Sequence, residues 1–290
     1  MLKLRYKHWL VLPSIVVMLV VLIFPLIYSL QTSLFFHVLS RPNYRPFIGL
    51  QNYVAVLNDP QMHNAVLVTL RFAGMAIAIE LLVGFILAHA LRRINFLRNV
   101  FVSLLMIPIM VTPIAIGLIW RMLLHPELGI VNYVLSEVGI GGRPWLGTAA
   151  TALPTLIFVN VWQWTPFMMI LLYAGLLSLP EEPFEAATID GANFWQKIWY
   201  LELPMLRDII AVAVTIRLID LLRTYDLVYI LTGGGPGNTT ETISYYIYRL
   251  GFVSLDMGRA SAASYMFLIV MVIATTFILQ RALRVGQVSS

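Results

Sequence analysis

The sequence contains no cysteine and little charge, and both absences narrow the functions it can serve. Asp, Glu, Lys and Arg make up 11% of its 290 residues, whereas about 25% is usual for a soluble globular domain. Hydrophobic residues account for 60% of the chain. Without cysteine, a disulfide framework and thiol chemistry are excluded. The composition therefore predicts a protein that crosses a lipid bilayer several times.

Neither a metal site nor a nucleic-acid partner is predicted. The formal net charge of +5 is explained by loops rich in Lys and Arg on one side of a membrane, so it does not require nucleic acid. The five histidines are scattered and lack the spacing of metal ligands; they are His8, His37, His63, His89 and His125.

The apolar runs predict an all-α membrane protein with six transmembrane helices, forming a single domain over residues 1–290. The first run follows three basic residues, as in a signal peptide, but no cleavage site of small residues follows, so we expect a retained span. Pro108 and Pro113 predict a kink in the third span. The predicted spans are residues 9–30, 66–91, 100–124, 152–177, 206–231 and 260–279.

The polar segments between these spans predict three external loops and one large internal loop. The external loops are residues 32–64, with a short helix near 50–57, residues 125–150, and residues 232–258. The internal loop is residues 178–205. The N- and C-termini are then both cytoplasmic.

The distribution of basic residues supports this orientation, because cytoplasmic segments of membrane proteins are enriched in Lys and Arg. Five arginines fall in the external segments: Arg41, Arg45, Arg143, Arg249 and Arg259. Ten basic residues fall in the internal segments: Lys3, Arg5, Lys7, Arg92, Arg93, Arg98, Lys197, Arg207, Arg281 and Arg284.

The 178–205 loop is too polar to cross a bilayer and too apolar to be free in solution. Its aromatic and aliphatic residues recur at helical spacing on either side of Gly191. We therefore expect a short helix, a glycine-centred turn, and a second short helix that stops at Pro204. Small residues in the first helix suit docking against another protein. The alternative is an amphipathic helix pair that only connects two spans.

This loop carries Glu185-Ala186-Ala187, Gly191 and Leu203-Pro204. These positions have the spacing of the family pattern of the EAA loop of ABC importer permeases, which this loop resembles. Leu201 stands where the family usually has Ile. We call residues 178–205 the EAA-like loop. The resemblance implies docking of an ATPase through Glu185, Ala186, Ala187, Asp190, Gly191, Leu203 and Pro204.

Two further segments are similar to sugar permeases of the maltose and trehalose type: residues 48–60, and the glycine-rich residues 231–242. The resemblance implies a permease subunit of a bacterial type I ABC carbohydrate importer, in the cytoplasmic (inner) membrane. It implies a second homologous permease, two ATPase subunits and an extracytoplasmic sugar-binding protein as partners. ATP and Mg²⁺ would be bound by the ATPases and no cofactor by this chain, which would not itself be an enzyme. Transport would proceed by alternating access.

The fourth predicted span carries polar and aromatic residues near its middle: Asn160, Trp162, Gln163 and Trp164. Indole rings stack on sugars, and amides hydrogen-bond hydroxyl groups. These residues are candidates for contact with a sugar or polyol. The alternative is that the two tryptophans are ordinary helix packing.

The fifth predicted span carries four charges at intervals of three residues: Arg217, Asp220, Arg223 and Asp226. Charged groups at membrane depth are costly, which makes them candidates for substrate contact. Spacing of three along a helix also suits a structural ladder of ion pairs, and this alternative is left open. Glu80 lies at a similar depth in the second span, so we expect a Glu80–Arg217 ion pair.

Two other functions remain to be weighed. An ion-driven secondary transporter would not need a loop for an ATPase, and inverted repeats or broken-helix sites are not evident in the sequence. An ABC permease for a non-sugar solute is the other alternative. The glycine-rich loop and the tryptophans of the fourth span favour sugar as the solute. The identity of the sugar is not readable from the sequence.

Overall fold

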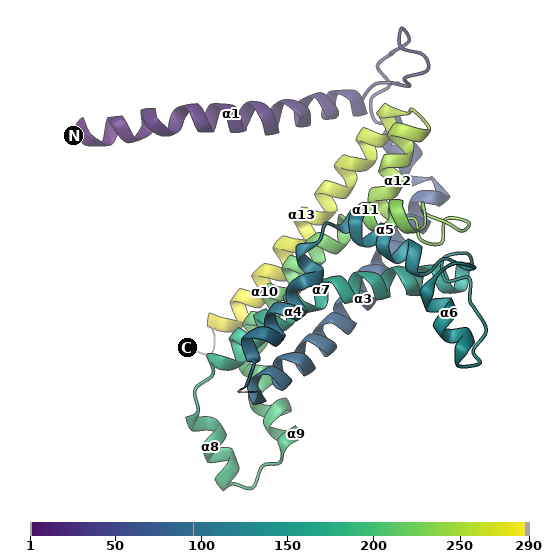
Figure 1. Ribbon diagram of the computed structural model, residues 1–290. Helices are drawn as coiled ribbons and strands as arrows, with labels where there is room; N and C mark the ends of the chain where they lie inside the picture. The colour runs from purple at the N-terminus through teal and green to yellow at the C-terminus, as the bar shows by residue number, and fades with distance from the viewer. Residues whose placement is uncertain (1, 95, 288–290) are drawn as a thin grey trace. The chain divides into compact units, whose positions relative to one another are not determined.

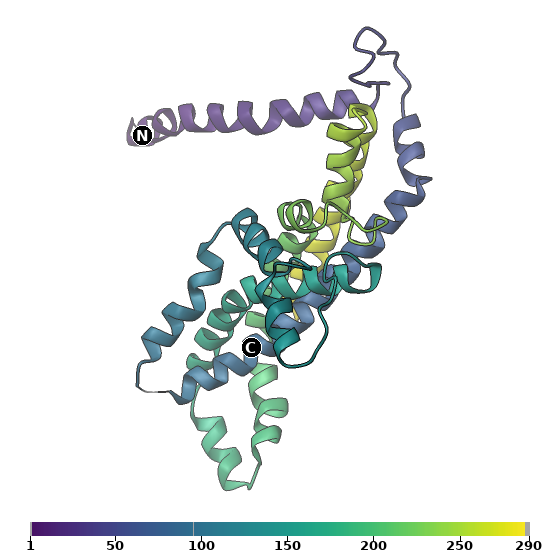
Figure 2. The ribbon, with the colours of Figure 1, turned by 45° about the vertical axis from the view of Figure 1, so that its right-hand side comes forward.

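A computed structural model describes residues 2–94 and 96–287, and the chain divides into two compact units. The first unit comprises residues up to His63 together with Tyr246–Val270, and the second comprises Asn64–Tyr245 together with residues from Met271 onward. Figures 1 and 2 show that the described residues are mostly helical. This agrees with the all-α class predicted from the sequence.

The first unit is built from helix ends and the loop after the first long helix. It contains α1 (Leu2–Ser33), α2 (Gln51–Leu57), the start of α3 (Pro60–Arg93), the π-helix η2 (Arg249–Val253) and the start of α13 (Met257–Gln287). Helix α2 confirms the short helix expected near residues 50–57. The most apolar stretch of α1 buries none of its side chains against described residues.

Side chains from α2 and α12 hold the irregular backbone of this unit. The Asn52 amide donates to the carbonyl oxygens of Ser33 and Phe35, at 2.8 and 2.9 Å. The buried Tyr246 hydroxyl donates to the Asp59 carboxylate at 2.7 Å. Burial and this hydrogen bond raise the pKa of Tyr246, so it stays protonated and donating at neutral pH.

The second unit contains most of α3 and the helices that follow it along the chain. They are α4 (Arg98–Met110), α5 (Pro113–Leu123), α6 (Ile130–Glu137), α7 (Ala149–Leu177), α8 (Glu182–Ile189), α9 (Phe194–Lys197), the π-helix η1 (Ile198–Glu202), α10 (Leu203–Leu222) and α11 (Asp226–Leu231), with α12 (Ile243–Tyr248) beginning at its end.

Helix α7 is the centre of this unit, because it is apolar on every side and mostly buried. Small residues let its neighbours approach closely. A Cβ atom at Gly175 would lie 2.8 Å from side-chain atoms of Leu206 and Ile209 on α10, and one at Gly84 on α3 would lie 3.1 Å from Met168. Glycine at these helix contacts is typical of membrane helix packing.

Within the described part of the chain, length and composition identify four helices that could cross a membrane by themselves: Val11–Ser33, Pro60–Arg93, Ala149–Leu177 and Met257–Ile278. The pair Arg98–Met110 and Pro113–Leu123 would make a fifth span if it crossed as one bent element. Helix α10 is not among them, because Arg207, Asp208, Arg217 and Asp220 interrupt its apolar surface. The six-span count and the orientation of the termini stay predictions.

The kink expected in the third span is a complete break. Helices α4 and α5 meet at an angle of 93° across Val111 and Thr112. Pro113 is the first residue of α5, where its missing N–H costs nothing, and it holds Thr112 in an extended conformation with φ −62° and ψ 145°. The prolines therefore divide the predicted span 100–124 into two helices.

The predicted span 206–231 was wrong as one continuous helix. Helix α10 ends at Leu222, and α11 begins only at Asp226. The backbone groups freed by this break are paired by side chains from further along the chain. Thr242 donates to the carbonyl oxygen of Thr224 at 2.9 Å, and Ser244 donates to that of Leu222 at 3.2 Å.

Two of the predicted loops contain helices that were not expected, and the prediction about Pro204 was wrong. The predicted loop 125–150 contains α6, and the predicted loop 232–258 contains α12 and η2. Pro204 does not stop a helix. It is the second residue of α10, and the chain runs into it from α9 through the π-helix η1. A proline in the first turn is tolerated because its position needs no N–H donor.

Candidate functional site

The two helix breaks of the second unit meet at a polar cavity of about 160 Å³. Its walls come from the start of α5, the middle of α7, the end of α10 and the start of α11. We call it the polar cavity, lined by Pro113, Asn160, Gln163, Trp164, Arg217, Asp220, Arg223, Thr224, Tyr225, Asp226 and Leu227. Irregular backbone at membrane depth is tolerated where it lines such a cavity.

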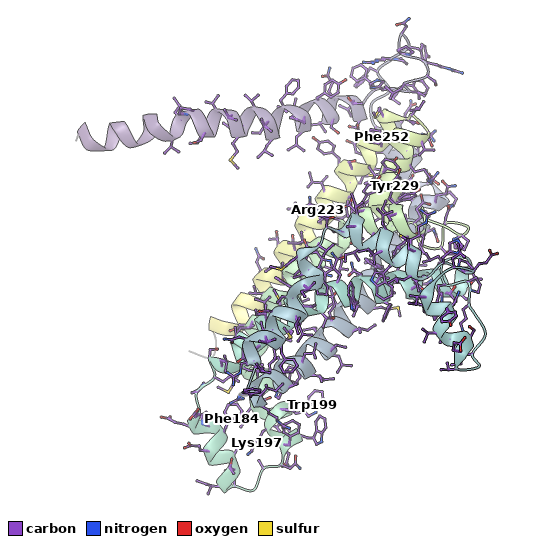
Figure 3. All side chains as sticks on the ribbon, in the orientation of Figure 1. Phe184, Lys197, Trp199, Arg223, Tyr229 and Phe252 are labelled. Atoms are coloured by element: carbon purple, nitrogen blue, oxygen red, sulfur yellow. The ribbon has the colours of Figure 1, made fainter. Side chains whose placement is uncertain are left out.

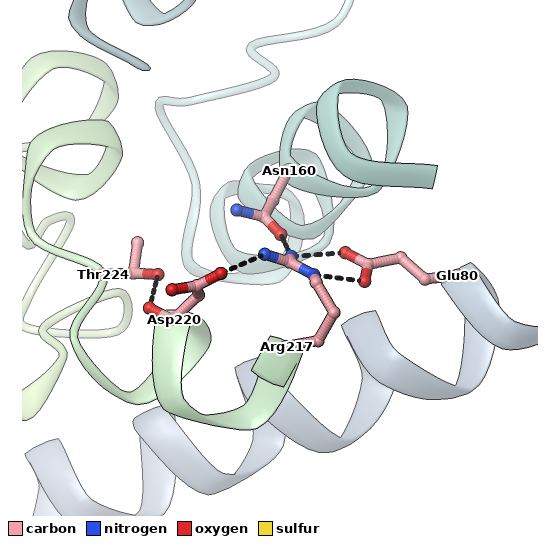
Figure 4. Close-up of polar contacts among 5 residues, drawn as sticks. All are labelled: Glu80, Asn160, Arg217, Asp220 and Thr224. Atoms are coloured by element: carbon pink, nitrogen blue, oxygen red, sulfur yellow. Dashed lines mark hydrogen bonds and ion pairs between the residues drawn. The ribbon is translucent and has the colours of Figure 1, made fainter. Parts of the chain in front are cut away.

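The expected Glu80–Arg217 pair is present, and it forms the buried floor of this site (Figure 4). Nε and one terminal nitrogen of Arg217 donate to the two oxygens of Glu80 at 2.8 and 2.7 Å. The same terminal nitrogen donates to the Asn160 amide oxygen at 3.0 Å. The side chains of Arg217 and Glu80 are 1% and 0% exposed. This parallel two-bond geometry joins α3 to α10.

Two further groups surround the Arg217 guanidinium. Its remaining terminal nitrogen lies 3.7 Å from an oxygen of Asp220, and its central carbon lies 4.6 Å from the centre of the Trp164 ring. The ring face is electron-rich, so this contact is attractive. The Asp220 side chain is 45% exposed, in contrast to its partner. Asp220 and Trp164 therefore connect the buried pair to the open part of the polar cavity.

Seven of the eight residues predicted to contact substrate line the polar cavity, and Trp162 does not. Residues two apart on a helix point to nearly opposite sides. Trp162 is accordingly 41% exposed and packs edge-on against Trp120, with ring centres 5.4 Å apart. Of the two tryptophans, the structure therefore places Trp164 at the polar cavity and Trp162 outside it.

The four charges of the predicted ladder line one cavity without forming one helical ladder. Arg217 and Asp220 lie on α10 and contact each other, as the spacing of three predicts. Arg223 follows the end of α10, and Asp226 begins α11. The helix break therefore brings Asp226 to the cavity by a turn of the chain rather than by helical periodicity.

Gln163 joins the first helix break to the cavity wall. Its amide nitrogen donates to the carbonyl oxygen of Val111 at 3.1 Å, which satisfies a backbone group freed between α4 and α5. Its amide oxygen is buried and has no hydrogen-bond partner among the described residues. A buried acceptor without a partner is costly unless a ligand or water supplies a donor.

The EAA-like loop has the predicted helices on either side of its glycine. Helix α8 ends at Ile189 and is capped by Asp190, and Gly191 has φ +79°, which favours glycine and closes the helix. Asn193 then caps α9 through reciprocal hydrogen bonds with Gln196, at 2.9 and 2.7 Å. In Figures 1 and 2, α8 and α9 extend beyond the neighbouring ends of α3 and α10.

Most of the residues predicted to serve ATPase coupling lie on the outside of this loop. Glu185, Ala186, Asp190, Gly191 and Pro204 are exposed, whereas Ala187 and Leu203 are half-buried. Ile189, which the prediction did not include, is 87% exposed. Figure 3 shows Phe184, Lys197 and Trp199 at the loop, well away from Arg223 in the same unit.

A cluster of charged and polar side chains around the Glu202 carboxylate lies at the base of the loop, and the sequence analysis did not predict it. Glu202, in η1, is buried and lies 2.7 Å from Nε2 of His89 on α3. Arg92 lies 3.7 Å from the other oxygen of Glu202. His89 and Glu202 are 113 positions apart in the sequence, and no spacing rule could have connected them. We call Glu202, His89 and Arg92 the loop anchor.

The glycine-rich loop 232–242 has a structural role in this unit. Gly233, Gly234 and Gly237 have positive φ angles, and a Cβ atom at Gly234 would lie 2.7 Å from the Tyr245 ring. The Thr240 hydroxyl oxygen lies 2.8 Å from both the hydroxyl of Thr232 and the carbonyl oxygen of Gly235. Among the described residues, no group of three or more His, Asp or Glu side chains could hold a metal ion.

Comparison with known proteins gives matches over most of the chain. The family model described as "Binding-protein-dependent transport system inner membrane component" matches residues 80–285. A probable ABC transporter permease protein, y4oQ, of Sinorhizobium fredii is 38% identical over 97% of this chain and 91% of its own. The trehalose/maltose transport system permease protein MalF of Thermococcus litoralis is 35% identical over 90% of each chain.

A solved structure has the same fold. It belongs to a bacterial ABC transporter involved in the import of the acidic polysaccharide alginate. It aligns with a TM-score of 0.82 and 25% identity, over 97% of this chain and 98% of that one. The helix arrangement described above is thus similar to that of a permease chain in an assembled importer.

Proposed function

The chain belongs to the family of binding-protein-dependent transport system inner membrane components, and we propose that it is the membrane-spanning permease subunit of an ATP-driven carbohydrate importer. Relatives named as trehalose/maltose permeases support carbohydrate as the cargo. The observation that carries the proposal is the polar cavity, because charged and amide side chains gather at two helix breaks within an otherwise apolar bundle.

The partners follow from the family and from the exposed EAA-like loop. A second homologous permease completes the translocation pathway, and an extracytoplasmic binding protein delivers the sugar. Two ATPase subunits dock on the EAA-like loop from the cytoplasm, and they bind ATP and Mg²⁺. This chain binds no cofactor and hydrolyses no ATP. It resides as a multi-pass protein in the cytoplasmic (inner) membrane.

Exposed apolar and small residues on α8 support docking at this loop. Ile189 is exposed at the end of α8, and Ala186 leaves room for a partner's backbone. Glu182 and Glu185 occupy the first turn, where negative charge favours the helix. Helix α8 is therefore stable although its outer surface packs against no other described part of this chain, and the ATPase covers that surface.

The loop anchor connects movement of the docked loop to the helices that line the polar cavity. Closure of the ATPases around ATP moves α8 and α9, and Glu202 passes this movement to α3 through His89. The same helix carries Glu80, which holds Arg217 at the cavity. Rocking of these helices between inward-open and outward-open arrangements is alternating access by rigid-body movement.

The decisive experiment uses the complete complex, purified with its ATPases and binding protein in lipid. ATP hydrolysis is measured against a panel of sugar-loaded binding proteins, and uptake is measured in parallel. We expect hydrolysis to rise with one sugar. Absence of an ATPase from the purified complex, or hydrolysis indifferent to the binding protein and sugar, would contradict the proposal.

Ionophores separate this function from an ion-driven secondary transporter. Helix breaks are present after all, and they are shared by both classes, so they do not decide between them. An ATP-driven importer keeps its uptake when proton and sodium gradients are collapsed while ATP is held constant. A secondary transporter loses it. The family match and the named relatives support the importer.

A further inference from the structure

One face of α3 is open next to the EAA-like loop. Two cavities of about 490 and 430 Å³ lie along it and share part of their lining, so we treat them as one groove and call it the α3 groove. The opposite wall comes mainly from α9, η1 and α10. On α3 the lining recurs every three or four residues, as one face of a helix does, at Ala78, Leu82, Phe85, His89 and Arg93.

The α3 groove has about the depth of one bilayer leaflet. Ala78 and Arg93 are separated by about 23 Å along the helix, at 1.5 Å rise per residue. One leaflet contains about 15 Å of hydrocarbon, and its polar headgroups extend several ångströms further. Ala78 lies close to Glu80, which we expect near the middle of its span, and Arg93 is the last residue of α3. The groove therefore extends from the middle of the bilayer to its surface.

The chemistry of the groove changes along this length. Leu82, Phe85 and Ile86 make its deeper part apolar. At the surface end Arg93 is exposed, and its guanidinium carbon lies 5.2 Å from the centre of the Phe194 ring. No carboxylate among the described residues pairs with Arg93. A guanidinium that contacts an aromatic ring keeps its N–H donors for a phosphate.

Two tryptophans belong to the wall opposite α3. Trp195 and Trp199 line the groove and are 66% and 65% exposed. The indole ring has an apolar body and a polar N–H, and tryptophan is enriched where membrane proteins meet the lipid headgroups. Both side chains therefore suit a surface in contact with lipid.

An amphiphile fits this groove better than a protein segment does. A docked helix could fill the apolar part, but it would also need an acidic side chain at one position to pair with Arg93. A phospholipid carries its phosphate directly beside its acyl chains. A zwitterionic headgroup supplies its own cation next to the phosphate, which weakens the attraction to Arg93. Basic pockets at the cytoplasmic ends of membrane helices bind anionic headgroups.

We propose that the α3 groove binds an anionic phospholipid from the leaflet on the side of the EAA-like loop. An acyl chain packs on Leu82 and Phe85, and the phosphate accepts hydrogen bonds from Arg93. The Phe194 ring that contacts Arg93 also lies edge-on to His89 of the loop anchor, with ring centres 6.2 Å apart. The lipid is thus bound beside the loop anchor. This inference rests on the membrane location in the proposed function and is independent of the cargo.

The test counts lipids bound to the complete importer complex by native mass spectrometry. The complex, purified with its second permease and ATPases, is titrated in detergent with dioleoyl phosphatidylglycerol or dioleoyl phosphatidylcholine. We expect one phosphatidylglycerol to bind at least about fivefold more tightly than phosphatidylcholine, which is the contribution of one basic residue near a membrane surface. Excess inorganic phosphate should not displace it, because burial of the acyl chain supplies most of the binding free energy.

Two substitutions separate the charge from the groove. Arg93→Gln should remove the preference for phosphatidylglycerol at this site. Ala90→Phe fills the groove at an exposed lining residue without changing charge, and it should weaken binding of both lipids. Arg207→Gln is the matched control. The Arg207 side chain is 40% exposed, is predicted on the same side of the membrane and is outside the groove, so the preference should remain.

Each contrary outcome overturns the inference. Equal binding of the two lipids by the unaltered complex would do so, as would an unchanged preference in Arg93→Gln. Displacement by inorganic phosphate would assign Arg93 to a soluble anion. Binding of no lipid would show that another subunit covers the groove. Sugar-dependent ATP hydrolysis is measured on the same preparation in lipid, and its absence would overturn the proposed function while leaving the lipid result separate.

Discussion

The polar cavity and the EAA-like loop are both rich in polar groups, yet they are built in opposite ways. At the cavity, Arg217 and Glu80 are buried and satisfied by each other, and the surrounding backbone breaks are paired by side chains. At the loop, small and apolar residues such as Ala186 and Ile189 are exposed. The cavity is lined by polar side chains that largely pair within this unit, whereas the loop exposes small and apolar side chains.

Helix α3 takes part in both regions, and its role reverses between them. At the cavity it supplies the acid, Glu80, to a base on α10. At the loop anchor it supplies the bases, His89 and Arg92, to an acid just before α10. The Glu80–Arg217 pair is buried, whereas the loop anchor is partly exposed. The buried pair therefore favours a fixed connection between helices, and the loop anchor favours a connection that can break during transport.

The largest effect is expected at the buried pair. Glu80→Gln removes the buried carboxylate that Arg217 contacts most closely, which we expect to destabilise the protein by about 3–5 kcal/mol. Combining it with Arg217→Met removes the stranded charge and should restore part of the loss. The thermal unfolding midpoint of the purified complex reports both. Equal destabilisation by the single and double variants would show that the pair is not a stabilising unit.

The next effect concerns the loop. Gly191→Asp should leave the protein in the membrane but lower uptake by at least about tenfold, because the added side chain obstructs docking and Asp adopts a positive φ reluctantly. Gly191→Asn has similar bulk and tolerates that φ angle, so it tests bulk without backbone strain. A docking defect should lower uptake in both variants. Uptake assays with parallel ATPase measurement compare them.

Gly139→Asp is the matched control for this loop. Gly139 has the same φ of +79°, and a Cβ atom there would likewise meet nothing within 4 Å. It lies just beyond α6, far from the EAA-like loop in the sequence. Uptake should be normal in this variant. Normal uptake by Gly191→Asp would reject the coupling role of the loop.

A smaller effect is expected at the loop anchor. Glu202→Gln keeps the shape of the side chain but removes its charge, which weakens its bonds to His89 and Arg92 by about 1.5–3 kcal/mol. We expect a lower ratio of sugar transported to ATP hydrolysed, with Glu202→Asp intermediate. Glu181→Gln, an exposed change at the start of α8, is the control. An unchanged ratio in Glu202→Gln would limit Glu202 to a structural role.

The smallest effect is expected from removal of the Trp164 ring, and it tests whether sugar binds at the polar cavity. Trp164→Ala should weaken sugar binding by roughly fivefold, since loss of one aromatic face costs about 1 kcal/mol. Trp162→Ala, two residues away on the same helix, should leave binding unchanged because its ring lies against Trp120. Equilibrium binding to the complex measures both. Equal losses would place the ligand somewhere other than the polar cavity.

The sequence was informative where one side chain needs another at the same membrane depth. Glu80 and Arg217 are costly alone in lipid, so each implied a partner, and they do form a pair. The helices on either side of Gly191 were also predictable, because glycine and the capping residue Asn193 act locally. Such rules depend on neighbours within a few residues or on burial alone.

The remaining features depend on contacts across long sequence separations. The break after Leu222 contains neither proline nor glycine, and its carbonyl groups are paired by Thr242 and Ser244, about twenty residues later. Apolar periodicity therefore predicted an unbroken span. Helical geometry implies opposite directions for Trp162 and Trp164, but which of the two faces the cavity became clear only when the neighbours of α7 were known.

The π-helix η1 at residues 198–202 sets the rotational phase between the EAA-like loop and α10. A π-turn holds one residue more than an α-turn, so it turns everything before it by about 100° about the helix axis. Shortening the chain by one residue here would preserve the composition of α8, α9 and α10 but would point the outer face of the loop in another direction. The direction in which the EAA-like loop faces is thus set by a single extra residue.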